Sequence, residues 1–174
     1  MRQHGDIRNL FDEVEHTAGD ERRDAFRRLV RLLAVHETAE EEVVHPSARG
    51  AFDGSEQTVA DRLEEERQAK EKLSRLDEMD TDDPTFVPTL LSLRTEVMEH
   101  ARAEERYEFT QLRRHLEPER LARMAKAVKA AEATAPTRPH PGVESAGKNV
   151  ALGPMAATVD RTRDAVRKAM GKDG

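Results

Sequence analysis

The chain of 174 residues contains no cysteine and no tryptophan, and aromatic residues make up only 3% of it. The absence of cysteine excludes disulfides, thiolate zinc sites, iron–sulfur clusters and cysteine nucleophiles. The sequence also contains no glycine-rich phosphate loop and no serine in a nucleophile elbow. No secretory signal peptide and no apolar run long enough to span a bilayer can be recognised, so we expect a cytoplasmic protein without a transmembrane segment.

Charged residues, in contrast, are abundant and make up 37% of the chain. Together with many alanines and leucines, they predict an all-α fold. The charge is unevenly distributed, because residues 1–116 carry 28 acidic and 18 Lys or Arg residues, whereas residues 117–174 carry 7 and 11. An acidic body argues against a nucleic-acid partner and favours the attraction of cations.

Amphipathic periodicity and turn residues predict five helices before residue 134. We expect them to run from the start of the chain to about Thr17, from Asp20 to about Pro46, from Ser55 to Met79, from Asp83 and Pro84 to about Leu116, and from Glu119 to Ala133. Short connections between long helices predict an up-down-up-down four-helix bundle over residues 1–116, with an additional helix in residues 117–133.

The C-terminal part of the chain is predicted to extend this bundle. Residues 134–153 are rich in Pro and Gly and form a predicted arm. A short amphipathic helix follows at residues 154–171, because four apolar residues have helical spacing, namely Met155, Val159, Val166 and Met170. This helix is a candidate contact surface for a second copy of the chain, as a homodimer, or for an anionic membrane surface.

One motif occurs twice, as His36-x-x-x-Glu40 and as His100-x-x-x-Glu104. Residues four apart project from the same face of a helix. Both pairs continue the apolar stripe of their helix. Burying an unpaired carboxylate at such a position costs on the order of several kcal/mol. In the second helix the stripe contains Phe26, Leu29 or Val30, Leu33, His36, Glu40, and Val43 or Val44; in the fourth it contains Phe86, Leu90, Leu93, Val97, His100, Glu104 and Tyr107.

The remaining two helices each place one more polar residue on their apolar stripe, His4 on the first and Glu66 on the third. Three imidazoles and three carboxylates suit two iron or manganese ions, and zinc would accept the same ligands. Glu40 and Glu104 are the natural bridging ligands, since a carboxylate can span two metals. The predicted metal ligands are His4, His36, Glu40, Glu66, His100 and Glu104.

Simpler readings remain open for several of these residues. A single His-x-x-x-Glu pair is usually an exposed ion pair, and Glu66 is close enough in phase to pair with Lys70. His45 lies nine residues after His36, on the opposite face of a straight helix, so we do not count it as a ligand. Glu41 and Glu105 also lie off the apolar stripes and should not share the role of their neighbours.

These residues give the chain a resemblance to the hemerythrin-like family of cation-binding four-helix domains, over about residues 2–116. The segments Gln3–Phe11, His36–Pro46 and His100–Phe109 are similar to the family's motifs on its first, second and fourth helices. The resemblance implies a non-haem di-iron site bridged by Glu40 and Glu104. It also implies a protein that binds or senses a small molecule such as O2, NO or peroxide.

The chain departs from the family pattern in two places. Glu66 stands where the family has a His on the third helix, and the chain begins just before His4, which raises the question of an upstream start codon. Anionic oxygen ligands stabilise ferric iron more than imidazole does, so Glu66 also favours a di-iron enzyme that turns over peroxide or oxidises ferrous iron. A metal-free helical interaction module is the third hypothesis.

Overall fold

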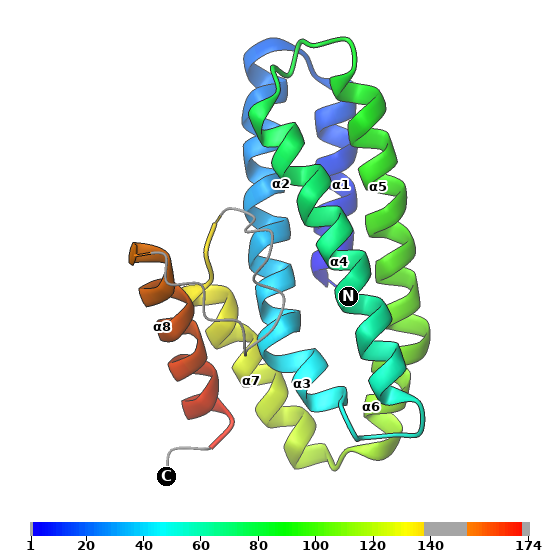
Figure 1. Cartoon of the computed structure of the whole chain (residues 1–174), viewed down its shortest axis with the longest axis vertical. Helices are drawn as coiled ribbons and strands as arrows, with labels where there is room; N and C mark the ends of the chain where they lie inside the picture. The colour runs from blue at the N-terminus through cyan, green and yellow to red at the C-terminus, as the bar shows by residue number, and fades with distance from the viewer. Residues whose placement is uncertain (1, 138–152, 172–174) are drawn as a thin grey trace.

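The structure is a computed structural model that describes residues 2–137 and 153–171, and these residues are almost entirely helical and contain no strand. The prediction of an all-α fold is therefore confirmed. Four antiparallel rods form a bundle, and two further described helices follow them in the chain; the two lie beside the bundle (Figure 1). The rods are α1 (Arg2–His16); α2 (Gly19–Ala39) with η1 (Glu40–Val44) and α3 (His45–Ala48); α4 (Ser55–Glu78); and α5 (Phe86–Ala103) with η2 (Glu104–Glu108) and α6 (Phe109–His115).

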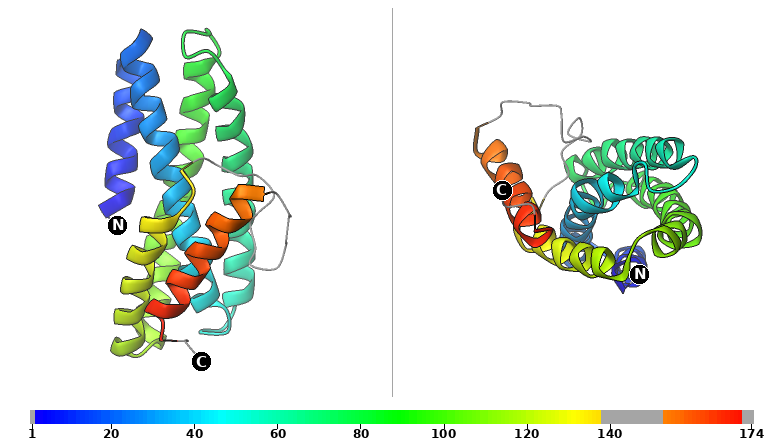
Figure 2. Two further views of the ribbon diagram at one scale, coloured as in Figure 1. Left: turned by 90° about the vertical axis from the view of Figure 1, so that its left-hand side faces the viewer. Right: turned by 90° about the horizontal axis from the view of Figure 1, so that it is seen from below.

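The two further helices are α7 (Pro118–Thr134) and α8 (Gly153–Ala169). Helix α7 lies below the beginning of α1 and packs against α2 and η1, so it covers the lower part of the bundle where α1 does not reach (Figure 2). Helix α8 packs on the outer side of α7. The predicted arm at residues 134–153 falls largely outside the described residues, as does the side chain of Met155.

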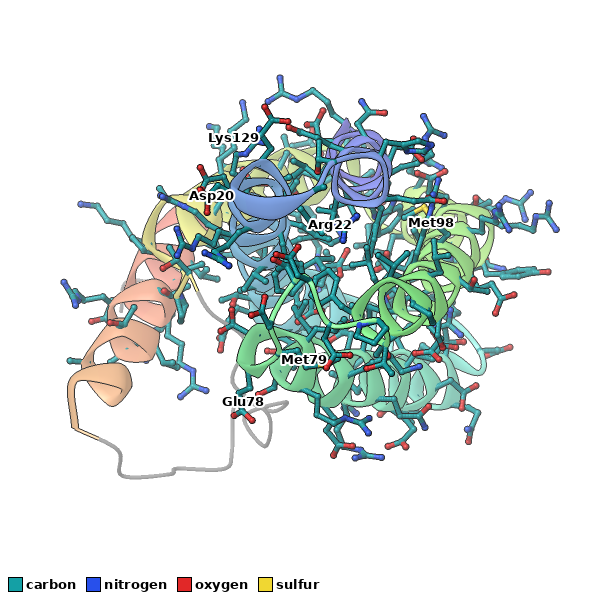
Figure 3. All side chains as sticks on the ribbon, turned by 90° about the horizontal axis from the view of Figure 1, so that it is seen from above. Asp20, Arg22, Glu78, Met79, Met98 and Lys129 are labelled. Atoms are coloured by element: carbon teal, nitrogen blue, oxygen red, sulfur yellow. The ribbon has the colours of Figure 1, made fainter. Side chains whose placement is uncertain are left out.

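Short connections with identifiable turn chemistry separate the rods. Gly54 has φ +79, a left-handed conformation that glycine adopts without strain, immediately before α4 begins. The backbone N–H of Thr85 donates to Asp83 Oδ1 at 2.7 Å, so α5 begins at Phe86, slightly later than predicted. At this end of the bundle, seen from above in Figure 3, Arg22 of α2 donates to the carbonyl of Thr81 at 3.1 Å.

The interior contains two apolar cores with a polar layer between them. The upper core joins α1, α2, α4 and α5, and the lower core joins η1, α3, α4, α6, α7 and α8. Along the second rod, the upper core ends with Leu33 and the lower core begins with Ala39. His36 and Glu40 lie at this boundary, and both are buried. The fold therefore places buried polar side chains at one level of an otherwise apolar bundle.

Two π turns change which side chains face the interior below this layer. Each begins at the Glu of a His-x-x-x-Glu motif, as η1 at Glu40 and as η2 at Glu104. A π turn contains one more residue than an α turn, so it shifts the helical phase of every residue that follows. The prediction that Tyr107 lies on the apolar stripe is wrong for this reason. Tyr107 is 60% exposed, while Glu108 is fully buried.

The packing of α7 on the bundle can be tested with alanines of that helix. Ala127 is fully buried, so Ala127→Leu should overpack the interface and lower the free energy of unfolding by about 1–3 kcal/mol. Ala125 lies on the exposed side of α7, so Ala125→Leu should change stability by less than about 0.5 kcal/mol. Urea denaturation followed by circular dichroism measures both. Equal effects of the two substitutions would show that α7 does not pack on the bundle in this way.

Candidate metal centre

All six predicted ligands meet in the polar layer, each rod contributing at least one. Two groups have ligand atoms that all lie within 4.8 Å of one another, so that each group could hold a metal ion. The first group contains His4, His36, Glu40 and Glu104, and the second contains Glu40, Glu66 and His100. Glu40 belongs to both groups, so a single carboxylate lies between two candidate metal positions.

The two carboxylates at the centre are Glu40 and Glu104, and the imidazole Nε2 atoms surround them. Glu40 Oε1 is 3.0 Å from His36 Nε2, and Glu40 Oε2 is 3.9 Å from His100 Nε2. Glu104 Oε2 is 3.4 Å from His4 Nε2 and 3.6 Å from His100 Nε2. Glu66 Oε1 is 3.9 Å from His100 Nε2. Both central carboxylates therefore have histidines of different helices as neighbours.

Each of the three histidines forms a hydrogen bond through Nδ1, the ring nitrogen that faces away from the central carboxylates. The Nδ1 atoms pair with Glu105 Oε1 at 2.8 Å for His4, with Gln3 Oε1 at 2.9 Å for His36, and with Glu65 Oε2 at 2.8 Å for His100. An oxygen acceptor at Nδ1 favours the tautomer that carries its proton there, and this leaves the Nε2 lone pair available. Such support of the second nitrogen is typical of metal-binding histidines.

Sequence analysis did not identify these three supporting residues. Gln3 and Glu65 each directly precede a predicted ligand, and Glu105 directly follows one, so a helical neighbour of a ligand on one rod supports a histidine on another. A partial signal for Glu105 was present in the sequence, because a second Glu follows the ligand Glu in both copies of the motif. Its two copies are used differently, because Glu105 bonds His4 whereas Glu41 forms an ion pair with Lys70.

In the absence of metal, burial and neighbouring charges shift the pKa values of the ligand side chains. Burial favours a neutral His36, and this effect, which outweighs the attraction of Glu40, lowers its pKa. Burial also raises the pKa of Glu104 to about 8, aided by the negative charge of Glu40. Burial alone would lower the pKa of His4, but hydrogen bonds with Glu104, Glu40 and Glu105 outweigh it and raise the pKa to about 9. Protons thus supply part of the positive charge that the carboxylates need.

Several of the buried ligand atoms have no hydrogen-bond partner. The unpaired atoms are His4 Nε2, His100 Nε2, Glu66 Oε2, and both carboxylate oxygens of Glu40 and of Glu104. Buried polar atoms without partners cost about 1–3 kcal/mol each, so a native fold rarely gathers this many in one layer. All of them are donor atoms that divalent iron, manganese or zinc accepts. The residues present therefore fit a metal site.

His45, like Tyr107, lies on a different face from the one predicted. We predicted it on the face opposite His36, but the π turn rotates it inward, and it is 2% exposed. Its Nε2 is 2.5 Å from Glu66 Oε1 and its Nδ1 is 3.2 Å from Glu108 Oε1. Burial would lower the pKa of His45, but the two carboxylates outweigh burial and raise it well above the usual value. A charged His45 therefore holds one oxygen of Glu66 and leaves the other oxygen unpaired.

A second charged cluster lies beside Glu66, on the side of η1 and α4. Lys70 is buried and pairs with Glu41, not directly with Glu66 as the phase of α4 had suggested. Burial raises the pKa of Glu41 to about 8, against the attraction of Lys70. Glu37 is buried next to this pair, and burial raises its pKa well above the usual value.

A small cavity of about 120 Å³ adjoins the candidate metal positions. Its polar wall includes five of the six predicted ligands, all except Glu104, and its apolar wall comes from the upper core, including Leu33, Val97 and Met98. Glu65, Glu96 and Glu99 line it as well. A space of this size admits a molecule of a few atoms next to the ligand atoms, and no large substrate.

The buried contacts of His45 predict a strong effect on stability. His45→Phe removes the cation between two buried carboxylates, and breaking a buried pair in this way should lower the free energy of unfolding by about 3–5 kcal/mol. His16 is exposed, so His16→Phe should have an effect of less than about 0.5 kcal/mol. Urea denaturation of the metal-free protein measures both changes, and a His45→Phe protein as stable as His16→Phe would contradict the inward orientation of His45.

Comparison with known proteins agrees with this geometry. Residues 1–112 match the family model of the hemerythrin HHE cation binding domain. The chain is 30% identical over 139 residues to an uncharacterized hemerythrin-like protein of Schizosaccharomyces pombe, covering 78% of this chain and 68% of that protein.

It is also 28% identical over 131 residues to a DNA nickase of a Nostoc species, covering 74% of this chain but only 36% of the nickase. No solved structure matches the chain significantly. Within the described residues, no helix is long and apolar enough to cross a membrane. Because the family model covers more than half of the chain and includes every residue of the polar layer, this protein belongs to the hemerythrin HHE cation-binding family.

Proposed function

We propose that the polar layer holds two non-haem iron ions, and that the protein binds or senses a small oxidant such as O2, NO or peroxide at this centre. One ion would be held by His4 and His36 and the other by Glu66 and His100. Glu40 would bridge them, and Glu104 would be the second bridge, because its Oε2 lies at similar distances from His4 and from His100. Such a centre supplies reversible one- and two-electron chemistry to a ligand in the adjacent cavity.

The observation that carries this proposal is the pairing of His36 with Glu40. Nδ1 of His36 is engaged by Gln3, and the lowered pKa of His36 keeps its ring neutral, so its Nε2 presents a lone pair. That lone pair lies 3.0 Å from Glu40 Oε1, an atom that itself has no hydrogen-bond partner. Two electron-rich atoms that face each other in a buried site repel each other. A metal cation would remove this repulsion, because both atoms would coordinate it.

The same observation speaks against a metal-free interaction module. A bundle that served only as a scaffold would be more stable with apolar residues at these positions, since replacing buried charges by well-packed apolar side chains is often stabilising by about 1–4 kcal/mol. The cavity supports a small ligand, because it lies against His4, His36, Glu40, Glu66 and His100. We extend no DNA-directed activity from the nickase to this chain, because residues 1–116 are strongly acidic.

A di-iron enzyme is the second candidate, and the asymmetry of the ligand set supports it. One position would have two imidazoles, whereas the other would have one imidazole and the carboxylate of Glu66. An anionic oxygen ligand lowers the reduction potential of iron and disfavours stable, reversible carriage of O2. Peroxide turnover or ferrous oxidation is the chemistry that such a site would support.

Metal analysis tests the proposed centre. Aerobically purified protein should contain about two iron atoms per chain, as the six ligands suggest, and should absorb in the near ultraviolet as ferric carboxylate proteins do. Glu66→Ala should lose iron from one position, whereas Glu64→Gln, at an exposed residue of the same helix, should keep both ions. A colourless protein that takes up no iron would refute the proposal. Full iron content in Glu66→Ala would show that Glu66 is not a ligand.

Addition of hydrogen peroxide separates the two candidate functions. An enzyme should release oxygen continuously, as recorded with an oxygen electrode, in proportion to its iron content. A binding or sensing protein should show a spectral change that reverses when peroxide is removed, with no sustained oxygen release. Glu66→His, which restores the family's usual ligand type, should shift the protein toward the second behaviour, because imidazole raises the reduction potential relative to a carboxylate.

The raised pKa values predict how stability depends on pH. The pKa is about 9 for His4 and about 8 for Glu104 in the folded protein, against ordinary values of 6.5 and 4.5, so the metal-free fold binds more protons than the unfolded chain. Its free energy of unfolding should therefore fall as the pH rises from about 7 to 9. The fall is up to about 1.4 kcal/mol per pH unit for each proton that the folded protein binds in excess of the unfolded chain.

Iron should remove or reverse this fall, because metal binding displaces the same protons and strengthens as the pH rises. Thermal melting of the metal-free and iron-loaded proteins across this pH range measures the difference. Melting temperatures that change in parallel would show that metal and protons do not compete for the same side chains.

A further inference from the structure

A second polar feature lies outside the bundle, on the opposite side of η1 from the candidate metal centre. Here η1 and α3 meet α7 and α8 around a groove of about 650 Å³. Four arginines line it, Arg120 and Arg123 from α7 and Arg163 and Arg167 from α8. In Figure 1 these two helices lie side by side next to α3. We call this feature the arginine groove.

The groove has a large excess of positive charge. Among the described residues that line it, Glu42 is the only acidic one, so four arginines and one glutamate give this lining a net charge of +3. Glu42 Oε1 accepts from Arg163 Nε at 3.1 Å, with side chains that are 13% and 22% exposed. Arg120 and Arg123 form no side-chain hydrogen bond or ion pair within the part of the chain that the structure describes. Arg167 pairs with Asp164 of its own helix, which does not line the groove. Arg120 and Arg123 are therefore the two groove arginines whose charge is not balanced by a carboxylate of the described residues.

Three of the four arginines are exposed, and the groove is defined by the walls around which they gather. Val43 and Val166 are buried and form an apolar floor, and Ser47, also buried, contributes a hydroxyl. Helices α7 and α8 pack on each other, so arginines from two elements are held around one space. Charges that share a partly enclosed apolar surface interact more strongly than charges in open water.

The size and charge of the groove indicate the class of ligand. Guanidinium groups bind phosphate and carboxylate oxygens through paired hydrogen bonds, and they are the usual ligands where several phosphates are recognised. A volume of this order is typical of small-molecule pockets, roughly 300–1,000 Å³. An extended polyanion such as DNA would also meet the acidic surface of residues 1–116, which would repel it.

We propose that the arginine groove binds a small polyanion that carries two or more phosphate groups, and that Arg163 exchanges Glu42 for a ligand phosphate on binding. Glu42 then acts as an internal competitor, which occupies part of the site in the free protein. This proposal does not depend on the metal centre, because no residue of the groove belongs to either candidate metal group. The same chemistry could come from a soluble phosphorylated compound or from the headgroup of a phosphoinositide lipid.

Titration calorimetry of the full chain with inorganic pyrophosphate at physiological ionic strength tests the proposal. Arg163→Ala and Arg123→Ala should each weaken binding by about tenfold or more, as expected for the loss of a charge-assisted hydrogen bond. Arg161→Ala is the matched control, since Arg161 is an exposed residue of α8 that does not line the groove. It removes the same charge and should weaken binding by less than about threefold if long-range charge is screened.

Glu42→Gln gives the outcome that distinguishes a competitor from a merely structural ion pair. It should strengthen pyrophosphate binding, whereas Glu21→Gln, an equal charge change at an exposed residue of α2, should leave it unchanged. Thermal melting of each variant verifies that the fold is intact. Equal weakening of pyrophosphate binding by all three arginine variants would overturn the proposal. An unmodified chain that binds neither pyrophosphate nor phosphoinositide vesicles would also overturn it.

Two further arms of the experiment identify the source of the phosphate. Sedimentation with phosphatidylcholine vesicles that contain a phosphoinositide tests a lipid headgroup, and loss of this binding in Arg163→Ala but not in Arg161→Ala would support the groove with a lipid ligand. Titration with a short DNA duplex tests the alternative polyanion. Duplex binding that is stronger than pyrophosphate binding and insensitive to Arg163→Ala would contradict a small-molecule site.

Discussion

The burial of two carboxylates between two apolar cores is the constraint on which the rest of the structure depends. Glu40 is 3% exposed and Glu104 is fully buried, and their charges cannot be solvated by water. Positive charge has to be supplied within the layer, either by protons on His4 and His100, whose pKa values are raised, or by metal ions that the imidazoles of His4, His36 and His100 would bind. The supporting contacts at each Nδ1 fix the rings so that their Nε2 atoms face the carboxylates. Protons can neutralise part of the negative charge of the buried carboxylates, and two metal cations would neutralise more of it.

The π turns connect this constraint to the shape of the helices. Each turn begins at a central carboxylate and shifts the following residues by one position, which brings His45 and Glu108 inward. These two residues meet each other, and His45 also meets Glu66. The carboxylate of Glu66, at the position where the resemblance implies a histidine, thus has a partner of its own. The polar layer therefore extends beyond the six candidate ligands, and the extra charge of Glu66 is balanced locally.

Much of this arrangement could be predicted from the sequence, because helical periodicity is a strong signal in long amphipathic segments. The all-α fold followed from composition and spacing, and the inward positions of Glu40, Glu66 and Glu104 followed from their place in apolar stripes. Prediction failed where the phase changed, since nothing in the sequence marks a π turn. For that reason Tyr107 was expected inside and His45 outside. The supporting residues and the arginine groove depend on contacts between different helices, which periodicity along one helix cannot give.

The central claim is that two metal ions share Glu40. The most direct measurement is anomalous X-ray diffraction at the iron absorption edge from crystals of the iron-loaded protein. The account predicts two peaks in the anomalous map, one beside His4 and His36 and the other beside Glu66 and His100, with Glu40 between them. A single peak, or peaks away from Glu40, would contradict it.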